Sequence, residues 1–180
     1  CSSDGTAQEL AAAAAAAPGR VVVLTHVKRR GKSAALFTGL RSVRGDWVQL
    51  IDGDGQNDPA DVRRVWDLIA AKDENKALGI VCGRRTSRNG CGFKLIRTRA
   101  FQDLPYFASM HRFLPALVKR AGWGVREEPV ADRQRMHGVS KYGFLGRLAA
   151  GLVDLFGMIW LVRRGGYGVA AEWNDPRAMR

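Results

Sequence analysis

The chain has 180 residues, enough for one folded domain with a hydrophobic core. Its residues are 46% hydrophobic and 26% charged, ordinary globular values that exclude a wholly disordered, collagen-like or mucin-like chain. The 29 lysines and arginines exceed the 17 aspartates and glutamates by 12, which predicts an anionic partner: nucleic acid, a membrane surface or a phosphorylated substrate. Three widely spaced cysteines form neither a disulfide framework nor a zinc motif, which favours a reducing compartment.

The first half of the chain alternates predicted helices with predicted strands. Seven consecutive alanines, the best helix formers, predict a surface helix that Pro18-Gly19 ends. The elements predicted after it are a strand at 21–24, a helix at 33–43, a strand at 47–51, a helix that begins at Asp58-Pro59 and a strand at 77–81. This alternation is typical of an α/β fold with a mostly parallel sheet flanked by helices, in which ligands bind at the carboxyl ends of strands.

The second half carries two further helical patterns. One apolar stripe predicts a helix packed on the core, and its members are Met110, Phe113, Leu114, Leu117 and Val118. Residues 144–162 are more apolar, but Arg147 and Asp154 interrupt them, whereas a spanning helix needs about 20 apolar residues with few charges. We expect an amphipathic helix that lies on a membrane, with a buried core helix as the alternative. Arg163-Arg164 would suit an anionic cytoplasmic leaflet.

The strongest chemical signal follows the strand predicted at 47–51. Asp52 and Asp54 are two positions apart, so in extended geometry their carboxylates would face the same side. Hard carboxylates without thiol or imidazole suit Mg²⁺ or Mn²⁺, and Gln56 could add a neutral oxygen. Because Mg²⁺ completes its shell with waters and substrate phosphates, a nucleoside diphosphate is the natural partner.

The same segment has two other possible interpretations. The carboxylates could only cap the following helix, although Asn57 or Asp58 already fills that role. A calcium loop of the EF-hand type is excluded, since counting from Asp52 its sixth position is Asn57 rather than glycine and its twelfth is Arg63 rather than glutamate.

Basic residues in two places could bind phosphate. Gly31-Lys32-Ser33 looks like the end of a P-loop, but His26 stands where that motif needs its first glycine, so Lys32 either reaches a phosphate or is solvated. Residues 133–142 contain two arginines, a lysine, a serine and a glycine, and arginine forks bind phosphate in a bidentate manner. This loop either holds a phosphate or is a solvated basic loop.

Seven segments carry a family resemblance when taken together. They are Asp4-Gly5-Thr6, His26 with residues 31–35, residues 44–47, 52–59, 90–94, 110–117 and 135–142. In this order and spacing they resemble the family 2 glycosyltransferases, and within them the bacterial dolichol-phosphate mannosyltransferase-like group, which glycosylates polyprenyl phosphates. The resemblance extends to about Arg164. It implies a GT-A (Rossmann-like) fold whose first βαβ elements are missing here.

The resemblance also implies a site and a reaction. The implied metal ligands are Asp52, Asp54 and Gln56, with Asp54 as the catalytic residue; the implied donor-binding residues are Asp4, Lys32, Asp52 and Asp54; and the implied acceptor-phosphate residues are Arg133, Arg135, Ser140 and Lys141. The implied reaction is inverting transfer of a sugar from a nucleotide-sugar of the GDP-mannose or UDP-glucose type to a polyprenyl or dolichyl phosphate, with Mg²⁺ or Mn²⁺. The acceptor phosphate is already anionic, so no general base is assigned. His111 and Arg112 lie near where other members keep an acidic catalytic residue, and they receive no role.

The expected organisation is a partial GT-A domain at 1–143, the amphipathic membrane helix at 144–164 and an unassigned tail at 165–180. The expected location is peripheral or monotopic, on the cytoplasmic face of the bacterial inner membrane. Two other functions stay open: an inactive or fragmentary remnant of such an enzyme, and a basic nucleic-acid-binding module. The chain has no helix-turn-helix, RRM or zinc signature, so no nucleic acid partner is expected.

Overall fold

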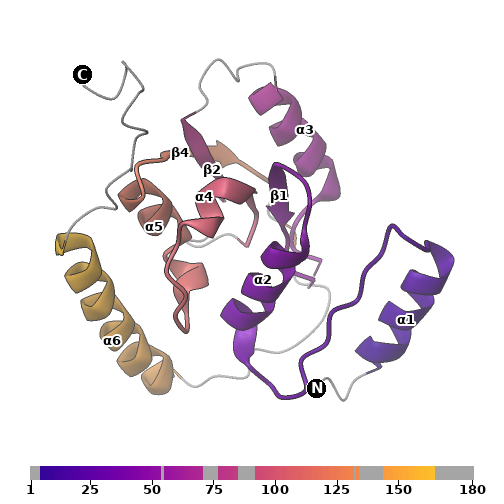
Figure 1. The fold of residues 1–180 in the computed structure, drawn as a ribbon, viewed down its shortest axis with the longest axis horizontal. Coiled ribbons are helices and arrows are strands. Elements are labelled where there is room, and N and C mark those ends of the chain that lie inside the picture. Colours follow the sequence, from indigo (N-terminus) through magenta and orange to yellow (C-terminus); the bar gives the residue numbers. More distant parts are fainter. Residues whose placement is uncertain are drawn as a thin grey trace, which may run out of the picture.

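A computed structural model of the chain describes residues 5–53, 55–70, 77–84, 92–131, 133 and 144–164, with the backbone alone for 144–150. The helices are α1 (Thr6–Ala16), α2 (Gly31–Ser42), α3 (Pro59–Ala70), α4 (Thr98–Gln102), α5 (Leu114–Arg120) and α6 (Phe144–Arg163), with a 3₁₀ turn, η1 (Met110–Arg112). The strands are β1 (Trp47–Leu50), β2 (Leu78–Arg84), β3 (Lys94–Arg97) and β4 (Gly124–Pro129). Figure 1 shows α1 and α6 on opposite sides of the sheet.

The sheet is mixed, in the order β1-β3-β2-β4. Strands β1, β2 and β4 run in one direction, while β3 lies between β1 and β2 and is antiparallel to both. The expectation of a mostly parallel sheet is therefore corrected, because only the β2–β4 ladder is parallel. The stretch between Arg84 and Lys94 is shorter than the dozen or so residues that a crossover between parallel strands needs, so it joins antiparallel neighbours.

Two hydrophobic clusters cover the two faces of the sheet. Ile80 and Val81 are adjacent in β2, and their side chains point to opposite faces and enter different clusters. Helix α3 covers the Val81 face with Val65 and Ile69. Buried residues from α2, α4, η1, α5 and α6 cover the Ile80 face, and they include Leu40, Phe101, Met110, Leu117 and Met158.

Helix α3 begins where the sequence predicted. The side chain of Asp58 accepts a hydrogen bond from the backbone N–H of Ala60 (3.0 Å), and Pro59 occupies the first helical position. One face of this helix buries Val65 and Ile69 against the sheet. The start of this helix fixes the chain direction directly after the predicted metal-binding segment.

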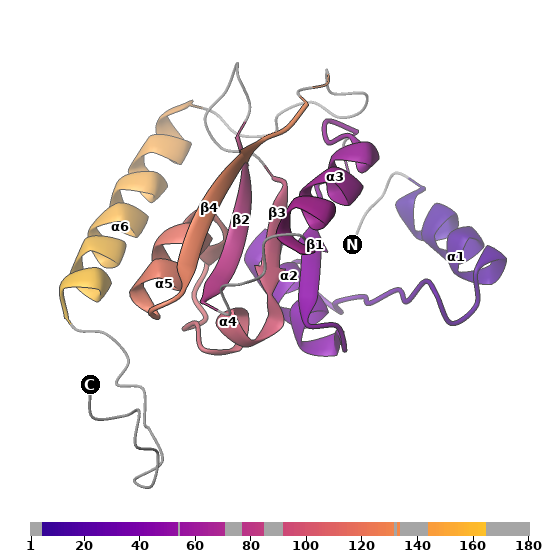
Figure 2. The ribbon, with the colours of Figure 1, turned by 90° about the horizontal axis from the view of Figure 1, so that it is seen from above.

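Residues 21–24 do not form the predicted strand. They have no strand partner in the described part of the chain, and the side chain of Val22 is 74% exposed. The segment instead lies outside the sheet and leads from α1 back to α2 (Figure 2). An apolar run becomes a strand only where a neighbouring strand accepts its backbone hydrogen bonds. The alanine-rich helix is confirmed as α1, which has no buried residue.

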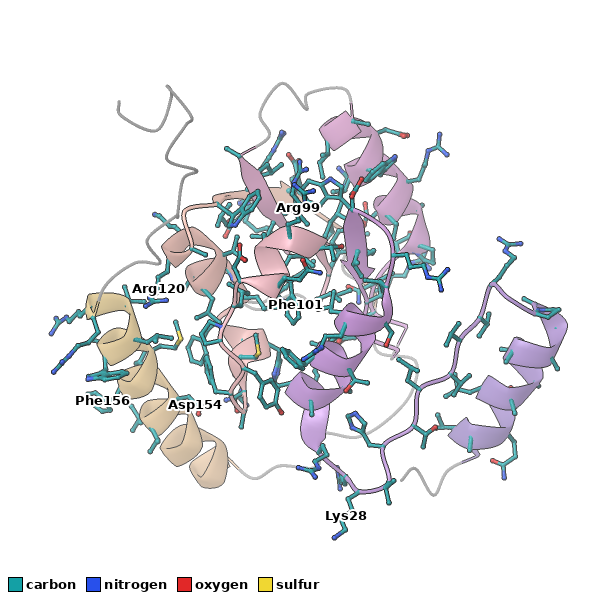
Figure 3. The ribbon with its side chains drawn as sticks, viewed as in Figure 1. Lys28, Arg99, Phe101, Arg120, Asp154 and Phe156 are labelled. Carbon is teal, nitrogen blue, oxygen red and sulfur yellow. The ribbon has the colours of Figure 1, made fainter. Side chains whose placement is uncertain are left out.

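One side of α6 packs on the body of the protein. Asp154 points toward the body (Figure 3) and forms an ion pair with Arg112 of η1 at 3.7 Å. The guanidinium of Arg120 donates a hydrogen bond to the carbonyl oxygen of Leu161 (3.0 Å), and Met158 is buried in the larger cluster. These contacts attach α6 to α5 and η1.

The opposite side of α6 is apolar and open to solvent. Val153, Phe156 and Trp160 are 72%, 68% and 60% exposed, and Phe156 points away from the body (Figure 3). The guanidinium of Arg164 lies over the ring of Trp160, 5.7 Å from its centroid. Among the described residues, no helix combines the length and apolarity that a membrane crossing requires. One face of α6 therefore packs on the core and the other presents apolar side chains to solvent, while the contact of this helix with a membrane stays a prediction.

Candidate functional site

The end of β1 and the first turn of α2 meet through an ion pair. The ammonium of Lys32 contacts the Oδ1 atom of Asp52, and the Asp52 side chain keeps 33% of its surface exposed. On its other side Asp52 lies against Gly92, where an added Cβ would overlap the carboxylate. The absence of a side chain at Gly92 therefore lets Asp52 sit between two chain segments, accessible to a ligand.

A small cavity of about 40 Å³ lies beside this pair. Its polar lining comes from four side chains on four elements: Lys32, Asp52, Lys94 and His111. Its apolar lining comes from Leu36, Leu50, Ile51 and Leu114. Polar groups thus converge on an apolar floor at the carboxyl end of β1, the usual place for a ligand in an α/β sheet.

His111 reaches this cavity from η1 and is held by Ser33. The Oγ atom of Ser33 lies 2.8 Å from Nδ1 of His111 and 3.4 Å from the backbone nitrogen of His111. Ser33 itself is buried in the first turn of α2, next to Lys32. Two successive residues of α2 therefore hold two lining residues of the cavity: Lys32 contacts Asp52, and Ser33 contacts His111.

The surroundings keep the imidazole of His111 neutral at neutral pH. The pKa of His111 is lowered from 6.5 to about 4, chiefly because burial disfavours a charged ring. The positive charges of Lys32, Arg112 and Lys94 contribute to this lowering, and the carboxylate of Asp52 acts in the opposite direction. The sequence assigned no role to His111, because no local spacing marks a residue whose partner lies 78 positions away.

A wider cavity of about 610 Å³ adjoins the small one. It lies between α1, the connecting segment and α2, and Lys32 lines both cavities. The basic residues of its wall are His26, Lys28, Arg29, Arg30 and Lys32. Its size falls within the range of ordinary ligand pockets, and its lysines and arginines suit an anion.

Arg133, the first residue of the predicted phosphate loop, lies against the predicted metal-binding segment. Its backbone N–H donates a hydrogen bond to the carbonyl oxygen of Gln56 (3.3 Å), and its guanidinium forms an ion pair with Asp58. The fold therefore brings the start of the basic loop to the acidic segment, although the two are far apart in sequence.

Asp61 fixes the point at which the chain leaves β4 toward Arg133. Its carboxylate accepts a hydrogen bond from the backbone N–H of Ala131 (2.7 Å) and pairs with Arg64 at 2.7 Å. Arg64 also donates to the carbonyl oxygen of Pro129, the last residue of β4. Asp61 is buried. Helix α3 thus holds the chain at Pro129, the last residue of β4, and at Ala131.

Not all of the predicted site residues lie in the described part of the chain. Asp4, Asp54, Arg135, Ser140 and Lys141 lie outside it, and their roles stay predictions. The structure does place Lys32 with Asp52, and Gln56 with Arg133.

The oxygen donors that the structure describes suit a hard divalent cation. Asp52 offers an accessible carboxylate, while Gln56, a neutral amide, is buried. No group of three His, Cys, Asp or Glu side chains gathers as a metal site among the described residues. Because Mg²⁺ is held by one or two carboxylates with waters and substrate phosphates, such a partial set still fits the ion.

Comparison with known proteins identifies the class. The mixed sheet with helices on both faces, with polar residues gathered at the end of β1, is a GT-A-like α/β fold. The profile described as Glycosyl transferase family 2 matches residues 1–134, and the chain belongs to this family.

Two curated relatives match much of the chain. A dodecaprenyl-phosphate galacturonate synthase of Rhizobium johnstonii is 30% identical over 159 residues, which cover 74% of this chain and 47% of that protein. An undecaprenyl-phosphate 4-deoxy-4-formamido-L-arabinose transferase of Edwardsiella ictaluri is 26% identical over 166 residues, with 80% and 51% covered. The chain spans about half the length of these relatives.

Solved structures share the fold at low sequence identity. Glucosyl-3-phosphoglycerate synthase from Mycobacterium tuberculosis, in complex with phosphoglyceric acid, matches with a TM-score of 0.59 and 18% identity over 90% of this chain and 66% of that one. The same enzyme with Mn²⁺, UDP-glucose and glycerol 3-phosphate matches with a TM-score of 0.52 and 18% identity over 74% of this chain and 55% of that one. The expected GT-A fold class is confirmed.

Proposed function

We propose that this chain transfers a sugar, with inversion, from a nucleotide-sugar to a polyprenyl or dolichyl phosphate at a membrane surface. The observation that carries the proposal is the contact of Arg133 with Gln56 and Asp58. This contact brings Arg133, the first residue of the predicted phosphate-binding loop, next to the predicted metal-binding segment, which supports the proposal. The names of both curated relatives specify a polyprenyl phosphate, which supports this acceptor class.

The donor half of the site would use the basic wall and the acidic segment together. Lys32 and its neighbours in the wide cavity would attract the diphosphate of a GDP-mannose-type or UDP-glucose-type donor. Asp52, Asp54 and Gln56 would hold Mg²⁺ or Mn²⁺, which when bound neutralises charge on the leaving nucleoside diphosphate. The ion pair of Lys32 with Asp52 keeps both groups at the mouth of the small cavity before a donor arrives.

The acceptor half would use the basic loop. Arg133, with Arg135, Ser140 and Lys141, would hold the acceptor phosphate in line with the sugar, and this positioning supplies rate enhancement. A guanidinium has five N–H donors, so Arg133 can keep its ion pair with Asp58 and still donate a hydrogen bond to a phosphate oxygen. The phosphate oxygen is already ionised near neutral pH, so it attacks without a general base.

The lipid acceptor places the reaction at a membrane. The outward apolar face of α6, with Val153, Phe156 and Trp160, would lie in the interfacial region of the bilayer, and Arg163 and Arg164 would face anionic headgroups. This arrangement would keep the chain peripheral, on the cytoplasmic face of the bacterial inner membrane.

A donor screen tests the proposal. The chain would be incubated with undecaprenyl phosphate in vesicles, Mn²⁺ and single nucleotide-sugars, among them UDP-glucose and GDP-mannose, and lipid-linked sugar would be measured. We expect transfer from one donor, lost on chelation of the metal and in Asp54→Ala with the fold unchanged. Unchanged transfer by Asp54→Ala would overturn the metal assignment.

The same screen separates the other candidate functions. Donor binding without turnover for every sugar would indicate an inactive remnant. Salt-dependent DNA binding without any donor binding would indicate a basic nucleic-acid-binding module, since phosphate contacts to DNA weaken steeply with salt.

A further inference from the structure

We infer that His111 donates a hydrogen bond from Nε2–H to a phosphate oxygen bound in the small cavity between Lys32 and Lys94. The inference rests on the proposed function, because that function supplies the two phosphates, one on the donor and one on the acceptor. It adds a substrate-contacting residue at a position that the sequence left without a role.

The contacts of Ser33 define which nitrogen of His111 carries the proton. Ser33 is 5% exposed, so its hydroxyl proton needs a protein acceptor. Its oxygen accepts the backbone N–H of His111, and Nδ1 of His111 is the one acceptor that contacts this hydroxyl within the described residues. Ser33 therefore donates to Nδ1, which leaves Nδ1 unprotonated and places the single ring proton of a neutral histidine on Nε2.

The same contact determines which edge of the ring meets a ligand. His111 lines the small cavity, whereas Ser33 does not. The Nδ1 edge is thus occupied by α2, and the remaining edge, which contains Nε2, faces the space bounded by Lys32, Asp52 and Lys94. A donor aimed at a polar cavity is the arrangement of an oxyanion-binding group.

The size and charge of the cavity select the ligand chemistry. A volume of about 40 Å³ exceeds the roughly 10–15 Å³ that one water needs, and it admits phosphate oxygens but not a sugar or a base. Among the described residues, Lys32, Lys94 and Asp52 are the charged groups that line it, and the two ammonium groups suit an anionic oxygen. A pKa of about 4 keeps His111 a neutral, directional donor at neutral pH.

Two substitutions separate the two nitrogens of His111. In His111→Gln the amide nitrogen can take the place of Nε2, so the donor is retained. In His111→Asn the shorter amide can take the place of Nδ1, so the contact with Ser33 is retained and the donor into the cavity is lost. The two variants are thus matched controls for each other.

The probes are inorganic pyrophosphate with Mg²⁺, which stands for the donor diphosphate, and farnesyl phosphate, which stands for the acceptor. We expect His111→Asn to weaken binding of one probe about ten- to a hundredfold, the range for a hydrogen bond to a charged group, with little change for the other probe. The affinity of His111→Gln for the same probe should stay within about threefold of the wild type, because this variant retains the hydrogen-bond donor. The probe that is affected identifies the phosphate.

The outcomes distinguish this inference from the proposed function. Equal affinity of the wild type and both variants for both probes overturns the role of His111 and leaves the proposed function standing. A wild-type chain that binds neither probe overturns both. Loss of binding in His111→Gln equal to that in His111→Asn also overturns the inference, since the retained donor then has no effect.

A measurement on the wild type avoids any dependence on how the variants fold. NMR of ¹⁵N-labelled imidazole at pH 7, with the His111 signal assigned from its loss in His111→Gln, reports the protonated nitrogen. We expect a neutral ring with its proton on Nε2. A proton on Nδ1, or on both nitrogens, overturns the inference.

Discussion

Arg133 forms an ion pair with Asp58, the residue that also caps the N-terminus of α3. One carboxylate oxygen receives the backbone N–H of Ala60, and the other receives the guanidinium. The position of the basic loop is therefore tied to the helix that follows the predicted metal-binding segment. A substitution at Asp58 can remove this ion pair and still leave a cap for α3.

The substitution Asp58→Ser keeps a capping oxygen and removes the carboxylate that Arg133 contacts. We expect the free energy of unfolding to stay within about 1 kcal/mol of the wild type, because half-exposed ion pairs contribute little. Asp58→Ala, which also loses the cap, should cost about 1 kcal/mol more. Urea denaturation checks both values. The KM for polyprenyl phosphate should rise by up to about fivefold in both variants. A rise in Asp58→Ala alone would assign the effect to the helix cap.

Gly92 tests whether the position of Asp52 matters. Gly92→Ala should displace the Asp52 carboxylate from its present position, because the new Cβ has no room beside it. We expect metal-dependent transfer to fall by about tenfold or more, since a displacement of about 1 Å in a site can cost a hundredfold. The free energy of unfolding should fall by only about 1 kcal/mol, because a partly exposed carboxylate can move to make room for the methyl group.

The control is Gly39→Ala in α2, where an added Cβ meets no atom within 4 Å. It should leave transfer unchanged and stabilise the helix by up to about 1 kcal/mol. Equal transfer by Gly92→Ala and the wild type would show that the close approach of Asp52 to Gly92 has no part in the reaction.

The sequence predicted those helices and strands whose own residues form a local pattern typical of the element. Helices α2, α3 and α6 correspond to the helices predicted at 33–43, from Asp58-Pro59 and at 144–164, and Asp58-Pro59 marks the start of α3. Strands β3 and β4 were missed: β3 has only four residues, and β4 contains Arg126, Glu127 and Glu128. They are strands because neighbours pair with them, and β4 satisfies its buried Glu128 with Arg126.

The candidate site also has a part that the sequence predicts and a part that it does not. The residues from Asp52 to Asp58 are close together in the sequence, so their pattern predicts a metal-binding segment. The contacts that build a cavity around it join distant positions, Ser33 with His111 and Gln56 with Arg133. No periodicity or spacing links such pairs, so only the fold reveals them.

Asp61 offers a stability test of the exit from β4. Asp61→Ala would leave the N–H of Ala131 without its protein acceptor and would remove the partner of Arg64. We expect a loss of about 1–3 kcal/mol in unfolding free energy, because the hydrogen bonds that are lost are made to a buried, charged carboxylate. Hydrogen exchange at Ala131 should also become faster.

The matched control for Asp61 is Asp67→Ala on the same helix. Asp67 pairs with Arg63 at 3.0 Å, but both side chains are exposed, so the loss should stay below about 0.5 kcal/mol. Similar losses in the two variants would mean that Asp61 is an ordinary surface acid.

The outer face of α6 gives a test of membrane binding. Phe156→Ser and Trp160→Ser should each weaken binding to vesicles that contain anionic lipid by about tenfold, because each exposed ring would otherwise leave water. Co-sedimentation with vesicles measures this. Leu10→Ser in α1 removes an exposed apolar side chain from the other side of the sheet and should have no effect. Equal losses in all three variants would argue against α6 as the membrane contact.

The pKa of His111 predicts a stability change in mild acid. Its value in the folded state is about 4, below the 6.5 of the unfolded chain, so the unfolded state binds more protons between these pH values. Stability from this group is therefore complete above about pH 6.5 and is lost as the pH falls toward about 4. The charges that face the ring are Lys32 of α2, Lys94 of β3, the adjacent Arg112, and Asp52 after β1.

His111→Gln isolates this contribution, because glutamine does not titrate. We expect the wild type to lose more unfolding free energy than His111→Gln as the pH is lowered from 7 to 5, when both are followed by urea denaturation at each pH. The difference between the two curves should become constant above about pH 8, where neither the folded nor the unfolded wild type protonates the ring appreciably. Parallel curves through the whole range would mean that His111 titrates alike in the folded and unfolded chain, and its burial against Ser33 would then not govern its charge.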